Sequence, residues 1–184
     1  MRIISKKSAH VPVQLDQAFE RYYSSIFRYF RYRGADIDTA NDLASSTFER
    51  ALGAIHHFDP RKSQIQTWLF AIARNVAINH LKSESIRFSV SLDDELPDSN
   101  DPPLEKMMIS VESKEQMLTA LQSLDSRARE IIALKFGGPL TNRQIAELVN
   151  LTEQNVAVIL YRSLLKMRQL LSVREEEHHD SKLY

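Results

Sequence analysis

Residues 140–168 read LTNRQIAELVNLTEQNVAVILYRSLLKMR, the pattern of two helices joined by a tight turn. Ala146 permits the helices to cross closely, and Asn150 tolerates the left-handed backbone that such a turn requires. Val156 then points back into the joint, which Leu160 seals. The stretch predicts a helix-turn-helix, a motif whose second helix is offered to the major groove of DNA. A generic helical hairpin has the same pattern and is the alternative at this point.

The N-terminal half has apolar side chains at helical spacing over residues 13–33, 38–56 and 64–83. Gly34 ends the first of these stretches. Twelve of the 15 aromatic residues lie within residues 1–88, which is enough to supply this half with its own core. Nothing in the sequence indicates a strand, so we expect a helical N-terminal domain.

The second half begins with an acidic segment, residues 90–103, that also contains three prolines. It is too polar to be buried and too rich in proline for a helix, so we expect a linker. Helical spacing resumes near Leu104, Asp125 caps a later helix, and Thr141 with Gln144 predicts a capping box on the next one. The predicted fold is all-α, with two small helical domains, an acidic flexible linker and a C-terminal helix-turn-helix.

The charged side chains balance over the whole chain but are distributed unevenly along it. The 24 basic and 24 acidic side chains cancel, so the chain lacks a globally basic nucleic-acid signature. Residues 1–83 hold 12 basic and 7 acidic side chains, residues 84–115 hold 3 and 9, and residues 116–184 hold 9 and 8. Two weakly charged lobes therefore flank an acidic strip.

No side-chain set in the sequence suggests catalysis or metal binding. The chain has no cysteine, which excludes disulfides and thiolate ligands, and its six histidines are scattered or adjacent rather than spaced for zinc. No glycine-rich phosphate loop or Ser/His/Asp set is present, so we expect no cofactor and no catalytic residue. No apolar run approaches the length of a membrane span, and we expect a cytoplasmic protein.

The second helix of the motif leaves a polar outer face. Gln and Asn side chains can recognise adenine edges, while Arg and Lys bind phosphates. The candidate contacts to duplex DNA are Thr152, Glu153, Gln154, Asn155, Val158, Tyr161, Arg162 and Lys166. The alternative is an ordinary solvated face.

The N-terminal half has a different constellation, in which Trp68 begins a helix beside a basic loop with Arg61 and Lys62. Aromatic rings near cations suit single-stranded DNA, because bases stack on the rings while cations hold phosphates. An indole at this position can also serve as a core anchor.

Three blocks, residues 40–51, 68–81 and 124–168, together resemble the extracytoplasmic-function (ECF) sigma factors, a subfamily of the sigma-70 family of bacterial RNA polymerase subunits. The resemblance covers residues 15–172 in family order and spacing. It implies sigma region 2 at 13–88, a linker at 89–111, sigma region 4 at 112–172 and a disordered tail at 173–184.

The resemblance also implies functional residues. The residues implied for core-polymerase binding are Asp42, Leu43, Ser46, Thr47, Phe48 and Arg50. The residues implied for melting and recognition of the minus-ten promoter element are Phe58, Arg61, Lys62, Trp68, Arg74, Asn75 and Asn79. Residues 58–64 correspond to the loop that captures a flipped base. The residues implied for recognition of the minus-thirty-five element are the duplex-DNA candidates on the outer face of the motif, together with Arg143.

The chain departs from the family pattern at three places. Ser45-Ser46 replaces a common Gln-Glu, which bears on core binding, and Asn79 replaces a usual acidic residue. Residues 157–159 are apolar where the family often has Lys, Ser and Arg, so we expect weaker phosphate anchoring there.

The sequence thus predicts a non-enzymatic sigma factor whose partners are core RNA polymerase, promoter DNA and an anti-sigma factor. The first alternative is a transcriptional regulator that binds duplex DNA as a dimer. The second is an inactive sigma-like decoy that acts by protein interaction. An enzyme is a distant further alternative.

Overall fold

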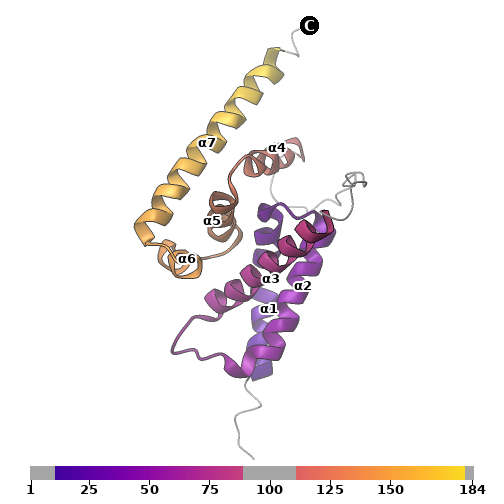
Figure 1. Ribbon diagram of the computed structural model, residues 1–184, viewed down its shortest axis with the longest axis vertical. Helices are drawn as coiled ribbons and strands as arrows, with labels where there is room; N and C mark the ends of the chain where they lie inside the picture. The colour runs from indigo at the N-terminus through magenta and orange to yellow at the C-terminus, as the bar shows by residue number, and fades with distance from the viewer. Residues whose placement is uncertain (1–10, 89–110, 181–184) are drawn as a thin grey trace, which may run out of the picture.

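The computed structural model describes residues 11–88 and 111–180, and these two ranges contain helices but no strand (Figure 1). The N-terminal lobe consists of α1 (Val11–Arg33), α2 (Ile37–Ala54), the short 3-10 helix η1 (Ile55–His57) and α3 (Ile65–Phe88). The C-terminal lobe consists of α4 (Val111–Gln122), α5 (Ser126–Gly137), α6 (Asn142–Val149) and α7 (Glu153–Asp180). The all-α prediction is confirmed.

The N-terminal lobe packs three helices around an aromatic centre. Gly34 ends α1 with φ +106°, a backbone conformation that L side chains rarely adopt. Tyr29, Phe30 and Phe70 are almost completely buried, and the Tyr29 ring lies edge-on to Phe70 with 5.8 Å between centroids. The predicted aromatic core therefore exists, and Phe70 of α3 occupies its middle.

Asp36 fixes the start of α2, because its carboxylate accepts hydrogen bonds from the Thr39 backbone N–H at 2.7 Å and the Thr39 hydroxyl at 2.9 Å. The backbone bond is the main reason that the pKa of Asp36 lies below its usual value. A lowered pKa gives stability that is present above the unfolded-state pKa, near 4, and is lost as pH falls below it.

We therefore expect Asp36→Ala to lower the free energy of unfolding at pH 7 by about 1 kcal/mol, since it removes a helix cap. Asp36→Asn should keep most of the cap, because Asn caps about as well as Asp, but should lose the contribution of the charge to the pH dependence. Urea titrations at pH 7 and pH 3 measure both effects. Equal losses for the two variants at pH 7 would contradict the capping role.

The C-terminal lobe contains the predicted helix-turn-helix, formed by α6 and α7. The Thr141 side chain accepts from the Gln144 backbone N–H, and the Gln144 side chain accepts from the Thr141 N–H, so the capping box is confirmed. Asn150 ends α6 in the left-handed conformation (φ 56°, ψ 53°), as expected. Ala146 and Val156 are buried at the joint, with 5% and 0% of their surface exposed.

The length of the motif's second helix and the state of the C-terminal tail differ from the prediction. The motif's second helix, α7, has 28 residues rather than being short, and it continues to Asp180. The predicted disordered tail is therefore helical from residue 173 to 180, because Glu-rich sequence favours a helix. Of the linker predicted at 89–111, residues 89–110, which include Leu104, lie outside the described residues, and Val111 begins α4. Residues 181–184 also lie outside them.

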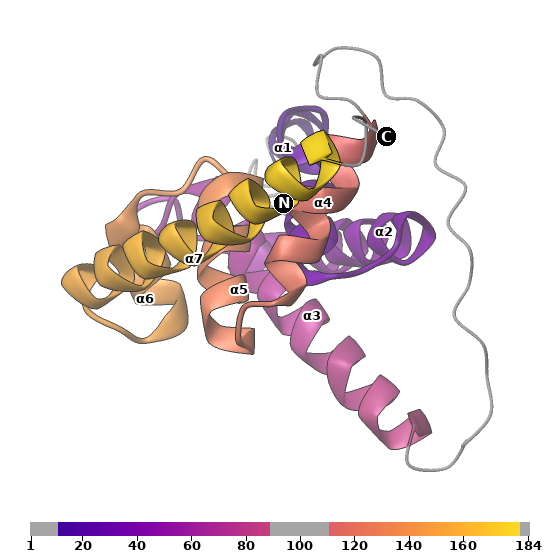
Figure 2. The ribbon, with the colours of Figure 1, turned by 90° about the horizontal axis from the view of Figure 1, so that it is seen from above.

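The two lobes contact each other directly. Helix α5 packs on α1 on one side and on α7 on the other, and α6 contacts α3 (Figures 1 and 2). Buried side chains of both lobes form one continuous apolar core. None of the helices in the described ranges is long and apolar enough to cross a membrane.

Candidate nucleic-acid interface

The outer face of α7 is open to solvent at all the positions that the sequence predicts to contact duplex DNA. The exposed set comprises Thr152, Glu153, Gln154, Asn155, Val158, Tyr161, Arg162 and Lys166, with Arg143 exposed on α6. The inner face is buried at Val156 and Leu160, as predicted, and also at Met167. Ser163 is also buried, which the helical spacing of apolar residues did not indicate.

Three of these exposed side chains have partners within the lobe. The Thr152 hydroxyl accepts from the Asn155 backbone N–H at 3.2 Å and so caps the start of α7. Lys166 donates to the Ser123 carbonyl at 2.7 Å, and Arg143 pairs with Glu147 at 3.4 Å. A lysine ammonium has three donors, so Lys166 can hold Ser123 and a phosphate together.

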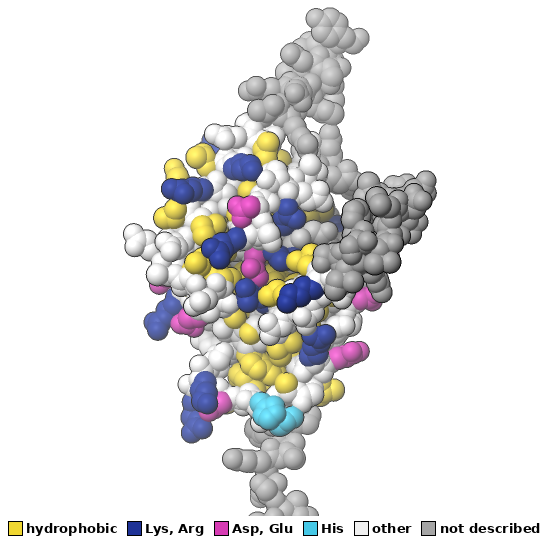
Figure 3. Space-filling view, viewed as in Figure 1, with side chains coloured by type: hydrophobic (Ala, Val, Ile, Leu, Met, Phe, Trp, Pro, Cys, Tyr) yellow, Lys and Arg dark blue, Asp and Glu magenta, His cyan; other side chains and the backbone are white. Residues whose placement is uncertain are grey.

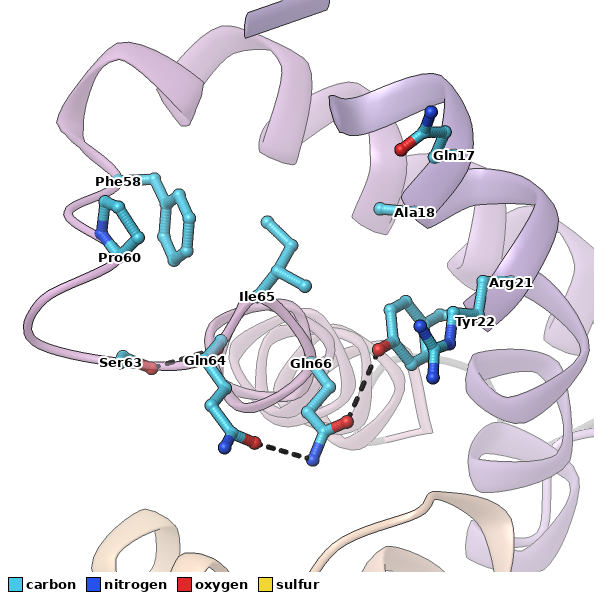
Figure 4. A pocket seen from close by; sticks show the side chains of 10 residues that line it. All are labelled: Gln17, Ala18, Arg21, Tyr22, Phe58, Pro60, Ser63, Gln64, Ile65 and Gln66. Atoms are coloured by element: carbon cyan, nitrogen blue, oxygen red, sulfur yellow. Dashed lines mark hydrogen bonds between the residues drawn. The ribbon is translucent and has the colours of Figure 1, made fainter. Parts of the chain in front are cut away.

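A hollow of about 440 Å³ lies between α1 and the start of α3 in the N-terminal lobe. Figure 4 shows Phe58 and Pro60 on the loop side, and Gln17, Ala18 and Arg21 across from them on α1. The remaining lining residues are Tyr22, Ser63, Gln64, Ile65 and Gln66. The predicted base-capturing loop therefore forms one wall of a cavity with both apolar and polar surface.

The rim of this hollow is held by hydrogen bonds that the sequence did not indicate. The Tyr22 hydroxyl donates to Gln66 Oε1 at 3.3 Å, and Gln66 Nε2 donates to Gln64 Oε1 at 3.1 Å (Figure 4). Tyr22 and Gln66 are 44 positions apart, so no local pattern could have paired them.

The predicted aromatic and basic residues for single-stranded DNA lie near the same loop. Trp68 is half-buried and its ring lies 5.2 Å from that of Phe58. The indole is thus partly a core anchor, as in the alternative interpretation, and partly accessible. Arg61 is exposed and pairs with Asp59 at 3.1 Å, and the hydrogen bonds from Arg61 lower the pKa of Asp59. Lys62 is also exposed.

The other minus-ten candidates lie along α3. Asn75 and Asn79 are exposed. Arg74 is half-buried, and its Nε donates to Glu130 Oε1 of α5 at 2.9 Å. Arg74 is therefore engaged with the other lobe in this structure.

The predicted polymerase-binding segment of α2 is divided between the surface and the core. Asp42 and Arg50 are exposed, and Leu43 and Ser46 are half-buried. Thr47 and Phe48 are 0% and 6% exposed and face the inside of the lobe, so in this structure they support the exposed part of α2 from beneath. The Thr47 hydroxyl donates to the Leu43 carbonyl at 2.7 Å.

Basic and acidic side chains alternate over the face of the molecule shown in Figure 3 instead of forming one basic surface. This distribution agrees with the net charge of zero. Sequence-independent attraction to phosphate should therefore be weak for the isolated chain.

Family models match both lobes. The model for Sigma-70 region 2 matches residues 18–86, and the model for Sigma-70, region 4 matches residues 114–167. Both matches lie within the domain limits that the sequence predicts, and they follow the family order.

Curated relatives agree with these matches. The ECF RNA polymerase sigma factor BldN of Streptomyces coelicolor is 28% identical over 174 residues, which are 93% of this chain and 65% of BldN. The chain thus spans slightly less than two thirds of BldN. The ECF RNA polymerase sigma factor SigM of Bacillus subtilis is 26% identical over 156 residues, 85% of this chain and 94% of SigM.

Two solved structures share the fold. The sigma factor RpoE of Bartonella quintana, in complex with the anti-sigma factor NepR, superposes with a TM-score of 0.75 at 18% identity and covers 87% of this chain and 98% of its own. CnrH, in complex with the cytosolic domain of CnrY, gives 0.62 at 20% identity over 88% and 90%. With region 2 and region 4 matched in order on one helical chain, the protein belongs to the ECF group of the sigma-70 family.

Proposed function

We propose that this chain directs core RNA polymerase to promoters as a non-enzymatic initiation factor in the cytoplasm. The observation that carries the proposal is that region 2 and region 4 follow one another on one chain and present two different surfaces. The hollow beside residues 58–64 is suited to an unstacked base, and the outer face of α7 is suited to a duplex groove.

The N-terminal lobe would bind the polymerase through the exposed part of α2, with Asp42, Leu43, Ser46 and Arg50. It would hold the melted minus-ten element between the loop and α3, where bases stack and cations hold phosphates. The C-terminal lobe would dock α7 on the minus-thirty-five element. Weak isolated affinity is offset in this scheme by attachment to the polymerase, which raises the effective concentration of each lobe at its element.

An anti-sigma factor is a further proposed partner. RpoE, which shares the fold, was solved with the anti-sigma factor NepR, and CnrH was solved with the cytosolic domain of CnrY. Co-purification of this chain with a partner that blocks its binding to polymerase would support the assignment.

Run-off transcription tests the function. Bacterial core RNA polymerase is supplied with genomic fragments, with and without this chain, and we expect discrete transcripts only with it. Core binding without transcripts would favour the decoy. Tight binding to a palindromic duplex in the absence of polymerase would favour the dimeric regulator.

Asn155 provides a test of duplex recognition. Its side chain is exposed on the first turn of α7, where an amide can form two hydrogen bonds with adenine. We expect Asn155→Ala to weaken discrimination at one position of the minus-thirty-five element by about 1–3 kcal/mol. Transcription from a library of upstream-element variants measures this. Gln169→Ala, an exposed amide farther along α7, is the control, and an unchanged base preference in Asn155→Ala would reject the role.

A further inference from the structure

The hollow between α1 and the loop at residues 58–64 has two walls of different chemistry. The wall formed by the loop and the start of α3 presents Phe58, Pro60 and Ile65, whose apolar surfaces suit contact with a flat ring (Figure 4). The volume of about 440 Å³ is in the range of ligand pockets, so the hollow admits a pyrimidine or a purine. Size alone therefore does not decide which base it holds.

The polar side chains on the loop side are already bonded to other groups of the protein. Ser63 Oγ donates to the Gln64 carbonyl at 3.1 Å, and Gln66 Nε2 donates to Gln64 Oε1 at the same distance. Gln66 Oε1 accepts from the Tyr22 hydroxyl. In Figure 4 the Gln64 and Gln66 amides point toward each other and away from Phe58. This side of the hollow therefore offers a base apolar contact rather than hydrogen bonds.

The free polar groups of the hollow lie on α1. Gln17 and Arg21 are four residues apart, so both lie on one face of the helix, and both are exposed. The Arg21 guanidinium lies 5.5 Å from the centre of the Tyr22 ring. Neither the Gln17 amide nor the Arg21 guanidinium has a hydrogen-bond partner among the described residues. Ala18 has only a buried methyl group, so it leaves the space in front of α1 open.

The donors and acceptors of these two side chains match one class of base. An amide has one kind of donor and one acceptor, whereas a guanidinium has donors only. The first two groups on the Watson–Crick edge of every base are one donor and one acceptor, and the Gln17 amide can turn to match either order. The third group must then accept from Arg21.

Only the pyrimidines meet this last condition. Cytosine and thymine both have the carbonyl oxygen O2 as the third group of the edge. Adenine has a C–H there, and guanine has an amino group, which is itself a donor and would face the donors of Arg21. A purine therefore leaves the guanidinium without its hydrogen bond, which is costly in a site where water is displaced.

We propose that the hollow selects a pyrimidine, with Gln17 and Arg21 as the residues that determine this specificity and Phe58 as the stacking surface. The inference rests on the proposed function, in which a base of the minus-ten element leaves the stack. It adds the class of base, and it places recognition of that base on α1, opposite the loop.

Binding of single strands to the complex of the full-length chain with core RNA polymerase tests the inference. Strands that bind the wild-type complex are selected from a random pool, and each base of a selected strand is then replaced by an abasic site. The captured position is the one whose loss weakens the wild type much more than it weakens Phe58→Ala. The four bases are compared there, and we expect a pyrimidine to bind at least about fivefold more tightly than a purine.

Variants of α1 separate recognition from stacking. Gln17→Ala and Arg21→Ala should each bring the four bases closer to equal binding, whereas Phe58→Ala should weaken binding of all four. Arg21→Glu should make guanine the preferred base, because a carboxylate accepts from its amino group. Arg28→Ala removes an exposed arginine elsewhere on α1 and is the matched control, which should keep the wild-type preference. Each variant must retain the helical circular dichroism of the wild type.

Equal binding of pyrimidines and purines at the captured position would overturn the inference, as would the absence of any such position. A wild-type preference that persists in both Gln17→Ala and Arg21→Ala would also overturn it. In these cases the chain would still direct strand binding, so the proposed function would stand. If the complex binds no strand better than core polymerase alone, the proposed function falls and the inference falls with it.

Discussion

Phe70→Ala is expected to lower the free energy of unfolding by about 3–5 kcal/mol, the usual cost of removing a buried aromatic ring. The Phe70 side chain is 0% exposed and packs edge-on to Tyr29, while Gly138 of the C-terminal lobe closes over it. Both the N-terminal core and the lobe contact lose packing in this variant. Because a domain is stable by only about 5–15 kcal/mol, much of the protein should be unfolded at moderate urea concentration.

Phe19→Ala is the comparison for this prediction. Phe19 is 45% exposed, although its ring lies 4.8 Å from Phe48 and 4.9 Å from Tyr23. We expect a loss of about 1 kcal/mol from these ring pairs. Urea unfolding followed by circular dichroism measures both variants, and similar losses in the two would show that Phe70 is not central to the core.

Arg74→Ala is expected to reduce open-complex formation by about 10- to 100-fold, since losing a charged hydrogen bond costs about 1.5–3 kcal/mol. Binding to core polymerase should not fall, because Arg74 lies on α3 and not on the exposed part of α2. In the structure the Arg74 guanidinium is hydrogen-bonded to Glu130 at 2.9 Å, and the proposed DNA contact would replace that bond. Permanganate footprinting measures melting, and a pull-down measures polymerase binding.

Two controls separate the roles of Arg74. A template with a premelted bubble should restore much of the transcription that Arg74→Ala loses, because strand separation no longer has to be driven by binding. Glu130→Gln removes the ion pair with Arg74 but keeps the guanidinium, so its open-complex formation should not fall. Loss of polymerase binding in Arg74→Ala would contradict the assignment to DNA.

The helix-turn-helix could be predicted from sequence in detail because its determinants are local. The Thr141–Gln144 capping box spans three positions, and the left-handed Asn150 depends only on its own backbone. Val156 follows from helical spacing and is buried as expected. Each of these features is encoded within one or two turns of the residue concerned.

Helical spacing and family resemblance disagreed at Phe48, and the spacing was correct about its environment. The residue belongs to the apolar side chains at helical spacing over residues 38–56, which predicts burial, whereas the resemblance assigns it to polymerase binding. The structure leaves Phe48 6% exposed, so it supports the exposed part of α2 from beneath. A family motif includes buried residues that support a surface as well as the exposed residues of that surface.

The packing of the two lobes could not be predicted from sequence. Gly137 and Gly138 stand at the end of α5, a common place for glycine, so nothing local points to a further role. Their further role is to leave room for Tyr29 and Phe70, which lie in the other lobe. The hydrogen bond from Arg33 to the Ser126 carbonyl also joins the two lobes, between residues 93 positions apart in the sequence. Contacts at such separation leave no periodic trace in the sequence.

The position of Gly138 so late in the chain has a consequence during protein synthesis. The N-terminal lobe is complete by Phe88, but its cover over Phe70 is supplied only when Gly138 has been translated. At bacterial elongation rates, the intervening stretch of about 50 residues takes roughly 3–10 s. For that interval the nascent lobe on the ribosome presents bare apolar surface, which a chaperone or the polymerase itself can reach before the chain covers it.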